Sequence, residues 1–486
     1  MSAFLSYVFP ASAECFVLVA SCVILMAGVF FPKRESLCYY LTQFTVLVAM
    51  VLTVWVFAKS VGAQGQPLYA YSQGYILDRL AVALKLLTLL CSFFTFIYAR
   101  SYNRVFNLPD VEFYVLSLLS ILGMLVLISG NNFIVLYLGV ELLSLPLYAM
   151  IAFQRDSARS VEASLKYFLI GAVASGLLLY GLSILFGLTQ SIEVPVVANV
   201  VATALSQQWH VVLFAMVFVL AGIAFKLGLA PFHMWVPDVY DGAPNSITLF
   251  VSGAPKVAAF GLLMRLLIET MPSASHEWQA LLIVIALLSM AIGNIAAIIQ
   301  TNIKRMLAYS SIAHSGYLLL GVLCATPRGY AAALFYLISY MVMSIGAFGM
   351  LVLLSCTGKE IRQVDDLHGL NARNPWLAFV FLLLLFSMAG IPPMVGFMAK
   401  VGVLEALIQA HLTWLAIVAI LFSVVGAFYY IRVIKVMYFE VPTEVTSVTL
   451  PRDGKIISSI NGLAVLALGI LPGFVYTLCH TVFYVV

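Results

Sequence analysis

The sequence predicts an all-α polytopic membrane protein with about 14 transmembrane helices. Of its 486 residues, 63% are hydrophobic and only 9% are charged. Its mean hydropathy is +1.08. A soluble domain carries about 25% charged residues, most of them on its surface, so the composition excludes that class of protein. Apolar runs long enough to cross the bilayer core, about 20 residues, recur along the whole chain.

These runs follow one another with short loops between them, which leaves no room for a separate soluble domain. We expect fourteen spans, at 11–31, 37–58, 76–99, 111–129, 132–153, 162–187, 209–234, 245–270, 278–299, 303–324, 329–355, 375–410, 413–438 and 457–478.

The basic residues give these helices an orientation. Loops after odd-numbered helices hold fifteen of them: Lys33, Arg34, Arg100, Arg104, Arg155, Arg159, Lys304, Arg305, Lys359, Arg362, Arg373, Arg432, Lys435, Arg452 and Lys455. Loops after even-numbered helices hold only Lys59 and Arg328. Because Lys and Arg accumulate in cytoplasmic loops, we expect the odd loops in the cytoplasm and both termini outside.

Two of the expected helices contain breaking residues. The seventh carries glycine and proline between Lys226 and His233, and the twelfth carries Gly390, Pro392 and Pro393. Proline removes a backbone donor and clashes with the preceding turn. In lipid such a break is tolerated only where the freed backbone groups meet protein or water, and paired broken helices indicate a transport site.

The two breaks occupy matching places. When helices 4–8 and 9–13 are grouped as two sets of five, each broken helix is the fourth of its set. The first set begins at the cytoplasm and the second outside, which predicts inverted repeats. We therefore expect three N-terminal helices in 1–110, the first repeat in 111–270, the second in 276–440, and a last helix in 441–486.

Five titratable residues lie inside apolar segments: Glu141, Lys226, Lys256, His314 and Lys400. Placing a charge in the bilayer core costs about 2.5–3.5 kcal/mol or more. Residues kept there at such cost indicate that the protein carries or gates protons or cations. A buried carboxylate near a lysine favours the charged lysine and desolvation the neutral one, so Glu141 is a candidate to switch a lysine.

Each of these residues also has a structural interpretation. Glu141 fits an ion pair that fixes packing, the lysines fit snorkelling or packing, and His314 fits a hydrogen-bonded core residue. Lys166 lies nearer a helix start and is a secondary candidate. We expect Glu162 and Arg265 at the membrane interface. His233 and Asp238 fit either the lining of a cytoplasmic entry or a cap of the break.

Other classes of site lack support in the sequence. The seven cysteines are scattered singly, so we expect no metal site and no iron–sulfur cluster in this chain. No glycine-rich dinucleotide motif follows a strand-like run, and the net charge of +4 does not indicate nucleic acid.

Two long strings carry a family resemblance: FHMWVPDVYDGAP at 232–244 and KRMLAYSSIAHSGY at 304–317. They resemble the antiporter-like membrane subunits of respiratory complex I, the proton-pumping NADH:quinone oxidoreductase. The resemblance covers at least residues 115–440. It implies that Glu141, Lys226, Lys256, His314 and Lys400 transfer protons through two half-channels.

The resemblance also implies the chain's surroundings. NADH, FMN, iron–sulfur clusters and quinone would be handled by partner subunits, and the complex would lie in a bacterial inner membrane. Its other membrane subunits would include antiporter-like paralogues of this chain. The end at Val486 disfavours the largest paralogue, which carries extra C-terminal helices, and Lys400 disfavours the middle one, which usually has glutamate there. Tyr240 and Gly242 favour the third paralogue. Pro255 departs from the family pattern, and we expect it to kink the helix of Lys256. Two other functions stay open: the large subunit of a sodium/proton antiporter, and an inert membrane spacer.

Overall fold

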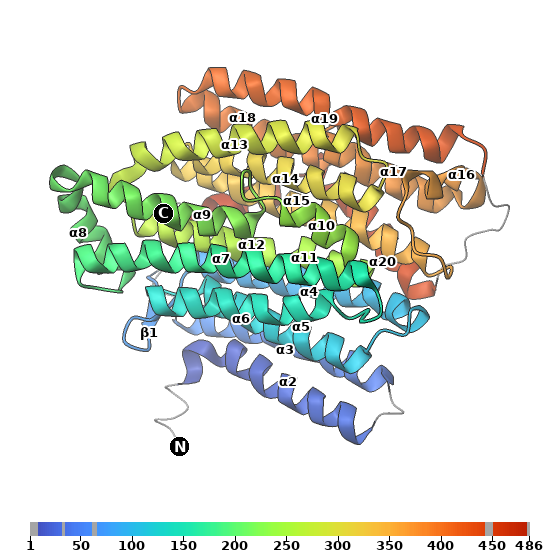
Figure 1. Ribbon diagram of the computed structural model, residues 1–486, viewed down its shortest axis with the longest axis horizontal. Helices are drawn as coiled ribbons and strands as arrows, with labels where there is room; N and C mark the ends of the chain where they lie inside the picture. The colour runs from blue at the N-terminus through green and yellow to red at the C-terminus, as the bar shows by residue number, and fades with distance from the viewer. Residues whose placement is uncertain (1–7, 32–34, 61–65, 443–450, 484–486) are drawn as a thin grey trace.

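The computed structural model describes residues 8–31, 35–60, 66–442 and 451–483, and these form a bundle of long helices that run side by side (Figure 1). Within these residues, 12 helices are long and apolar enough to cross a membrane. Helix α14 (Ile303–Val322) and the divided pair α17 (Pro375–Ala389) and α18 (Val395–Gln409) occupy the two remaining expected segments. The all-α polytopic fold is confirmed.

The N-terminal part consists of η1 (Phe9–Ala11), α2 (Ser12–Phe30), α3 (Glu35–Ser60) and α4 (Arg79–Val105). Strands β1 (Leu68–Ala70) and β2 (Tyr75–Leu77) pair antiparallel before α4, with Leu68 opposite Leu77. The sequence analysis did not predict this hairpin. Lys33 and Arg34, which entered the orientation argument, lie outside the described residues.

The central part begins with four helices: α5 (Asp110–Ile128), α6 (Phe133–Ile151), α7 (Ala158–Thr189) and α8 (Val194–Gln207). Helix α8 was not predicted. The broken region follows as α9 (Trp209–Leu227), α10 (Trp235–Gly242), α11 (Asn245–Ser252), α12 (Ala254–Leu263) and η2 (Met264–Glu269). The chain then continues through η3 (Pro272–Ala274), α13 (Ser275–Ile298), α14 and α15 (Pro327–Ser355).

The C-terminal part contains η4 (Val364–Leu367), α16 (Leu370–Arg373), the pair α17 and α18, α19 (Thr413–Phe439), α20 (Arg452–Ile470) and α21 (Gly473–Phe483). Helices α18 and α19 lie at the edge of the bundle opposite α2 (Figure 1).

Short polar side chains start several of these helices. The side-chain oxygens of Asn132, Asn302 and Asn374 accept hydrogen bonds from the backbone N–H three residues later, at the starts of α6, α14 and α17. Such caps satisfy amides that have no partner inside the helix. Asp78 does the same for α4, where its carboxylate accepts from the Ala81 amide at 2.7 Å.

Three expected segments differ in detail. The second half of the seventh helix, α10, lies beyond the predicted end at 234. The eighth is interrupted at Gly253 instead of bending at Pro255, which sits in the first turn of α12, where a missing amide N–H costs nothing. The expected span 457–478 is wrong as a single helix, because the chain leaves the helix at Leu471 and Pro472 and restarts as α21.

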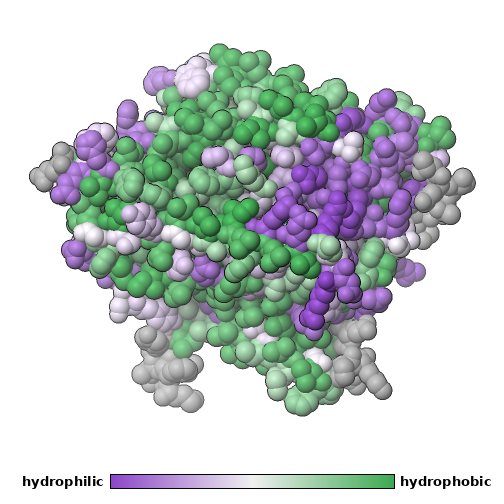
Figure 2. Space-filling model, viewed as in Figure 1, coloured by the Kyte–Doolittle hydropathy of each residue, from purple (hydrophilic) through white to green (hydrophobic). Residues whose placement is uncertain are grey.

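The bundle has an enclosed centre and an apolar outside. Every residue of the most apolar window of α11–η2 is buried, as is 89% of the window of α15. Only 28% of the window of α2 and 33% of that of α19 are buried. Figure 2 shows hydrophobic residues across the middle of the face and a concentration of hydrophilic ones at the end where α10 and α16 lie. This distribution suits a protein surrounded by lipid with polar ends in water.

Candidate functional site

Four of the predicted residues lie buried in the interior. Lys226 and Lys400 are 8% exposed, Lys256 is 5% exposed and His314 is 4% exposed. They come from α9, α18, α12 and α14 respectively. Glu141, on α6, is half-buried. The fold thus keeps these titratable groups out of water, as the sequence analysis predicted.

Lys226 lies in the last turn of α9, directly before the break. Gly228 follows with φ 70, a left-handed conformation that glycine adopts without a steric penalty and that ends the helix. The ammonium donates a hydrogen bond to Ser144 Oγ at 2.7 Å. Ser144 lies on α6, three residues after Glu141, and is fully buried.

In the described part of the chain, no carboxylate oxygen of Glu141 lies within 4.0 Å of the Lys226 ammonium nitrogen, so the two do not form a direct ion pair. Ser144 takes the place at the lysine that a paired carboxylate would fill. A static Glu141–Lys226 salt bridge is therefore not what fixes this packing.

Lys256 points from the start of α12 toward α14. Its ammonium donates to Ser311 Oγ and, at 3.3 Å, to Ser315 Oγ. Ser315 Oγ in turn lies 3.0 Å from the carbonyl oxygen of Leu227, the residue after Lys226. The Tyr340 ring lies 5.1 Å from the Lys256 ammonium. The serine hydroxyl thus connects Lys256 with the broken end of α9.

His314 has a tyrosine hydroxyl at each ring nitrogen. Tyr336 OH lies 2.7 Å from Nδ1, and Tyr430 OH lies 3.2 Å from Nε2. Tyr430 OH also contacts Ser310 Oγ. A ring with two such partners can accept a proton at one nitrogen and release one from the other.

Lys400 reaches from α18 back to the end of α17. Its ammonium donates to the carbonyl oxygen of Ala389 at 2.9 Å and to Ser423 Oγ at 2.9 Å. The last carbonyls of a helix have no partner within it and carry partial negative charge, so they solvate an ammonium well. Gly390 follows with φ 85, and a Cβ there would lie 2.9 Å from the lysine side chain.

Two small cavities lie between consecutive members of this row. One of about 10 Å³ has both Lys226 and Lys256 in its walls. The other, also of about 10 Å³, has both Lys256 and His314 in its walls. Because a cavity of roughly 10–15 Å³ holds one water molecule, each has room for about one.

Lys166 occupies a different place. Its side chain is 43% exposed and pairs with Glu162 at 2.7 Å and with Asp238 at 2.9 Å. Arg305 binds the other oxygen of Asp238 at 2.8 Å. Lys166 therefore belongs to a surface ion cluster and does not contact the buried row. His233 lies half-buried between α9 and α10, where its carbonyl oxygen accepts from the Val236 amide.

Arg265, which we expected at the membrane interface, is instead enclosed by protein. Its side chain is 1% exposed and forms a bidentate pair with Asp78, at 2.8 and 2.9 Å. A buried pair of Lys85 and Glu14, joined by Tyr75 OH, was also not predicted. Among the described residues, no group of three or more His, Cys, Asp or Glu side chains lies close enough to hold a metal ion.

The sequence analysis missed several hydroxyl partners of the row, namely Ser144, Tyr336, Tyr430 and Ser423. Ser144 could have been found, because its i+3 spacing from Glu141 places both on one face of α6. The others lie on different helices from the residues that they contact, and nothing in the sequence marks them.

Comparisons with known proteins agree with this geometry. A sequence profile described as "NADH:quinone oxidoreductase/Mrp antiporter, TM" matches residues 130–426. The protein named NADH-quinone oxidoreductase subunit N of Coxiella burnetii is 56% identical over 475 residues, 98% of each chain.

Two solved structures share the fold. A chain of respiratory complex I from Thermus thermophilus matches with a TM-score of 0.79 and 30% identity, over 96% of this chain and 98% of that one. A chain of an Mrp complex from a Dietzia species matches with a TM-score of 0.82 over 97% and 96%, but at 22% identity it shows only a common fold.

Proposed function

The chain belongs to the family of membrane subunits described as NADH:quinone oxidoreductase/Mrp antiporter, and we propose that its buried row of titratable residues forms one proton path. It is a proton-translocating membrane subunit of a redox-driven NADH:quinone oxidoreductase. The observation that carries the proposal is the buried series Lys226, Lys256, His314 and Lys400, with a water-sized cavity between the first two members and another between the second and third.

The first half of the path centres on Lys226 and Lys256. Lys226 takes a proton at the broken end of α9, where its ammonium donates to Ser144 Oγ and the negative charge of Glu141, one turn before Ser144 on α6, favours the charged form. A water in the cavity whose walls contain both lysines passes the proton to Lys256, whose ammonium donates to the Ser315 hydroxyl. Lysine suits this work because its ammonium loses its proton readily when buried.

The second half runs from His314 to Lys400. The ring of His314 passes the proton on through its two tyrosine partners, and Lys400 holds it against the carbonyls at the end of α17. Loss of this lysine's proton would free those carbonyls for water. Lys166 contributes from the surface cluster as a secondary residue.

We also propose the division of the chain that the breaks indicate. The segments 111–270 and 276–440 form two inverted repeats, flanked by three helices in 1–110 and the C-terminal part in 441–486. Support comes from the two breaks, each of which has a glycine with positive φ, Gly228 and Gly390, and a lysine nearby. The corresponding positions would serve two half-channels of opposite orientation.

The setting follows from the same proposal. The chain lies in a bacterial inner membrane with both termini on the periplasmic side. NADH, FMN, iron–sulfur clusters and quinone bind to partner subunits, whose electron transfer drives the path. The sodium/proton antiporter alternative draws support from the family profile, which also covers Mrp antiporters, and from the fold of the Mrp chain. That chain is 22% identical, whereas the relative named NADH-quinone oxidoreductase subunit N is 56% identical.

The test is substitution of Lys226 in the assembled enzyme. Lys226→Ala should lower quinone reduction and proton pumping at least about tenfold while assembly survives, because the first holder of the proton is gone. Lys226→Arg should also impair pumping, since arginine effectively never releases its proton. Proton pumping is measured for both variants in reconstituted vesicles. Full activity of an assembled Lys226→Ala enzyme would reject the path.

A further inference from the structure

The start of α14 docks onto the corner between α10 and α11. Three side chains from its cap and first turn bind α10 or the residue that follows it: Asn302 to Asp241 at 2.7 Å, Lys304 to the carbonyl oxygen of Ala243 at 2.6 Å, and Arg305 to Asp238 at 2.8 Å. Both α10 and α11 are parts of helices interrupted near a lysine of the path. The docking therefore joins α14 to the most irregular region of the fold.

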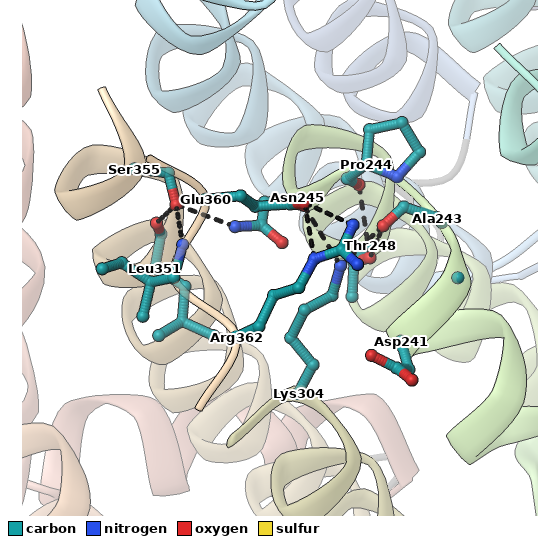
Figure 3. A network of polar contacts seen from close by, with 12 residues as sticks. Asp241, Ala243, Pro244, Asn245, Thr248, Lys304, Leu351, Ser355, Glu360 and Arg362 are labelled. Carbon is teal, nitrogen blue, oxygen red and sulfur yellow. Dashed lines mark hydrogen bonds and ion pairs between the residues drawn. The ribbon is translucent and has the colours of Figure 1, made fainter. Parts of the chain in front are cut away.

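Lys304 is the enclosed member of this set. Its side chain is 0% exposed, and its ammonium lies 3.5 Å from the Glu360 carboxylate as well as against Ala243. Figure 3 shows the side chain extending from α14 toward the corner. A charge enclosed to this degree is tolerated only when paired and hydrogen-bonded, so Lys304 is held in one place.

Glu360 connects the same corner with α4. It accepts from Arg362 Nε at 2.7 Å and from Tyr102 OH at 3.2 Å. The Asn245 amide N–H, at the start of α11, donates to Tyr102 OH at 3.1 Å. Burial alone would raise the pKa of Glu360, but Lys304 and Arg362 hold it below its usual value, so the carboxylate stays charged.

The geometry of α14 carries this anchoring to the proton path. Ser311 and Ser315 follow Lys304 by seven and eleven residues, which is close to two and three turns at 3.6 residues per turn. All three side chains therefore lie on one face of the helix. That face meets α12, where Ser311 and Ser315 contact the Lys256 ammonium.

We propose that Lys304, held by Glu360, is a positioning residue that sets the register of α14 against α11 and α12 and so places Ser311 on Lys256. The proposal rests on the role of Lys256 in the proposed path. Ser311 lies about 10 Å further along the axis of the same helix than Lys304. A displacement of the docked turn would therefore move Ser311 with it. Misplacing a reacting group by 1 Å can cost about 10²-fold in rate.

The experiment uses the assembled enzyme in vesicles. Lys304→Met removes the charge and keeps the length of the side chain, and Lys304→Arg keeps the charge. Lys359→Met is the matched control, because Lys359 lies at the same end of the molecule with its side chain 68% exposed. Ser311→Ala and the Lys304→Met/Ser311→Ala double variant complete the series. Pumping is measured across a pH range.

Lys304→Met should lower pumping about tenfold, Lys304→Arg should keep more than half, and Lys359→Met should match the unmodified enzyme. The double variant should pump no more than about twofold worse than Lys304→Met. Lys304→Met and Ser311→Ala should each change the shape of the pH profile of pumping in the same way. A merely looser fold would scale the profile at every pH and leave its shape unchanged.

Multiplying losses in the double variant, or unimpaired pumping by Lys304→Met, would overturn the positioning role. If Lys304→Met fails to assemble, Glu360→Gln replaces it in the same cycle with Ser311→Ala and is held to the same criterion. Lys256→Ala is measured alongside. Full pumping by Lys256→Ala rejects the path itself, whereas an inactive Lys256→Ala with multiplying Lys304 and Ser311 losses rejects only the positioning.

Discussion

Gly390→Ala is expected to disable Lys400 without touching a charged residue. Gly390 ends α17 with φ 85, and its missing side chain leaves the space that Lys400 occupies. A Cβ at this position would lie 2.9 Å from both Cδ and Nζ of the lysine, closer than such atoms pack. The ammonium must then move away from the end of α17.

Two costs follow from this substitution. The left-handed backbone costs an L-residue about 1–2 kcal/mol, which acts on the stability of the break. Each charged hydrogen bond that Lys400 leaves, to Ala389 O or to Ser423 Oγ, is worth about 1.5–3 kcal/mol. One lost bond therefore reduces the population of the correctly placed ammonium by roughly ten- to hundredfold, since 1.4 kcal/mol is about a factor of ten.

The assay is proton pumping and NADH-driven quinone reduction by the assembled enzyme in vesicles. Gly358→Ala is the control, because Gly358 has a similar φ of 99 but open space around a Cβ. Gly390→Ala should reduce pumping at least tenfold, and Gly358→Ala should leave it within twofold of the unmodified enzyme. Equal activities of the two variants would refute the steric account of Lys400.

Three further predictions concern orientation, Glu141 and the series of lysines. Reporter fusions at Arg104, Ser157 and Lys359 should report cytoplasm and those at Gln64 and Gln190 the outside; reversal at two or more sites would overturn the inverted repeats. Gln64 lies outside the described residues. Glu141→Asp should keep partial pumping and Glu141→Gln should lose most of it, with Ser144→Ala intermediate; equal rates for Asp and Gln would indicate packing instead of charge. Lys400→Ala should impair pumping, and Lys226→Ala/Lys400→Ala should be little worse than the more severe single variant, because one closed step already stops a series path; additive flux losses would mean independent paths.

The sequence predicts those features of the fold that depend on composition along the chain. Apolar length determined the spans, and the glycines and prolines after Lys226 and before Lys400 marked both breaks, because backbone groups freed in a membrane need partners wherever they occur. The buried positions of Lys226, Lys256, His314 and Lys400 followed from their apolar neighbours in the same way.

Contacts between distant helices could not be predicted from the sequence. Arg265 is separated by 187 residues from Asp78, and no local pattern announces that pair. Tyr430 reaches His314 across 116 residues for the same reason. The interruption at Gly253 was assigned to Pro255, because proline is the stronger breaker in a sequence, although the first turn of a helix accepts it readily.

The enclosure of the apolar window of α11–η2 bears on how the chain is made. The segment Asn245–Glu269 contains an interruption and a lysine, and its hydropathy is 1.6, compared with 2.6 for the next span, Pro272–Ile298. It therefore inserts into the bilayer less favourably than that span. The polar partners of Lys256 are supplied by α14, which is synthesised about fifty residues later, since Ser311 is 55 positions further on. Until α14 is inserted, the hydroxyls of Ser311 and Ser315 cannot accept hydrogen bonds from Lys256. Chains truncated before α14 would lack these partners of Lys256, and a charged lysine in the bilayer core costs about 2.5–3.5 kcal/mol or more.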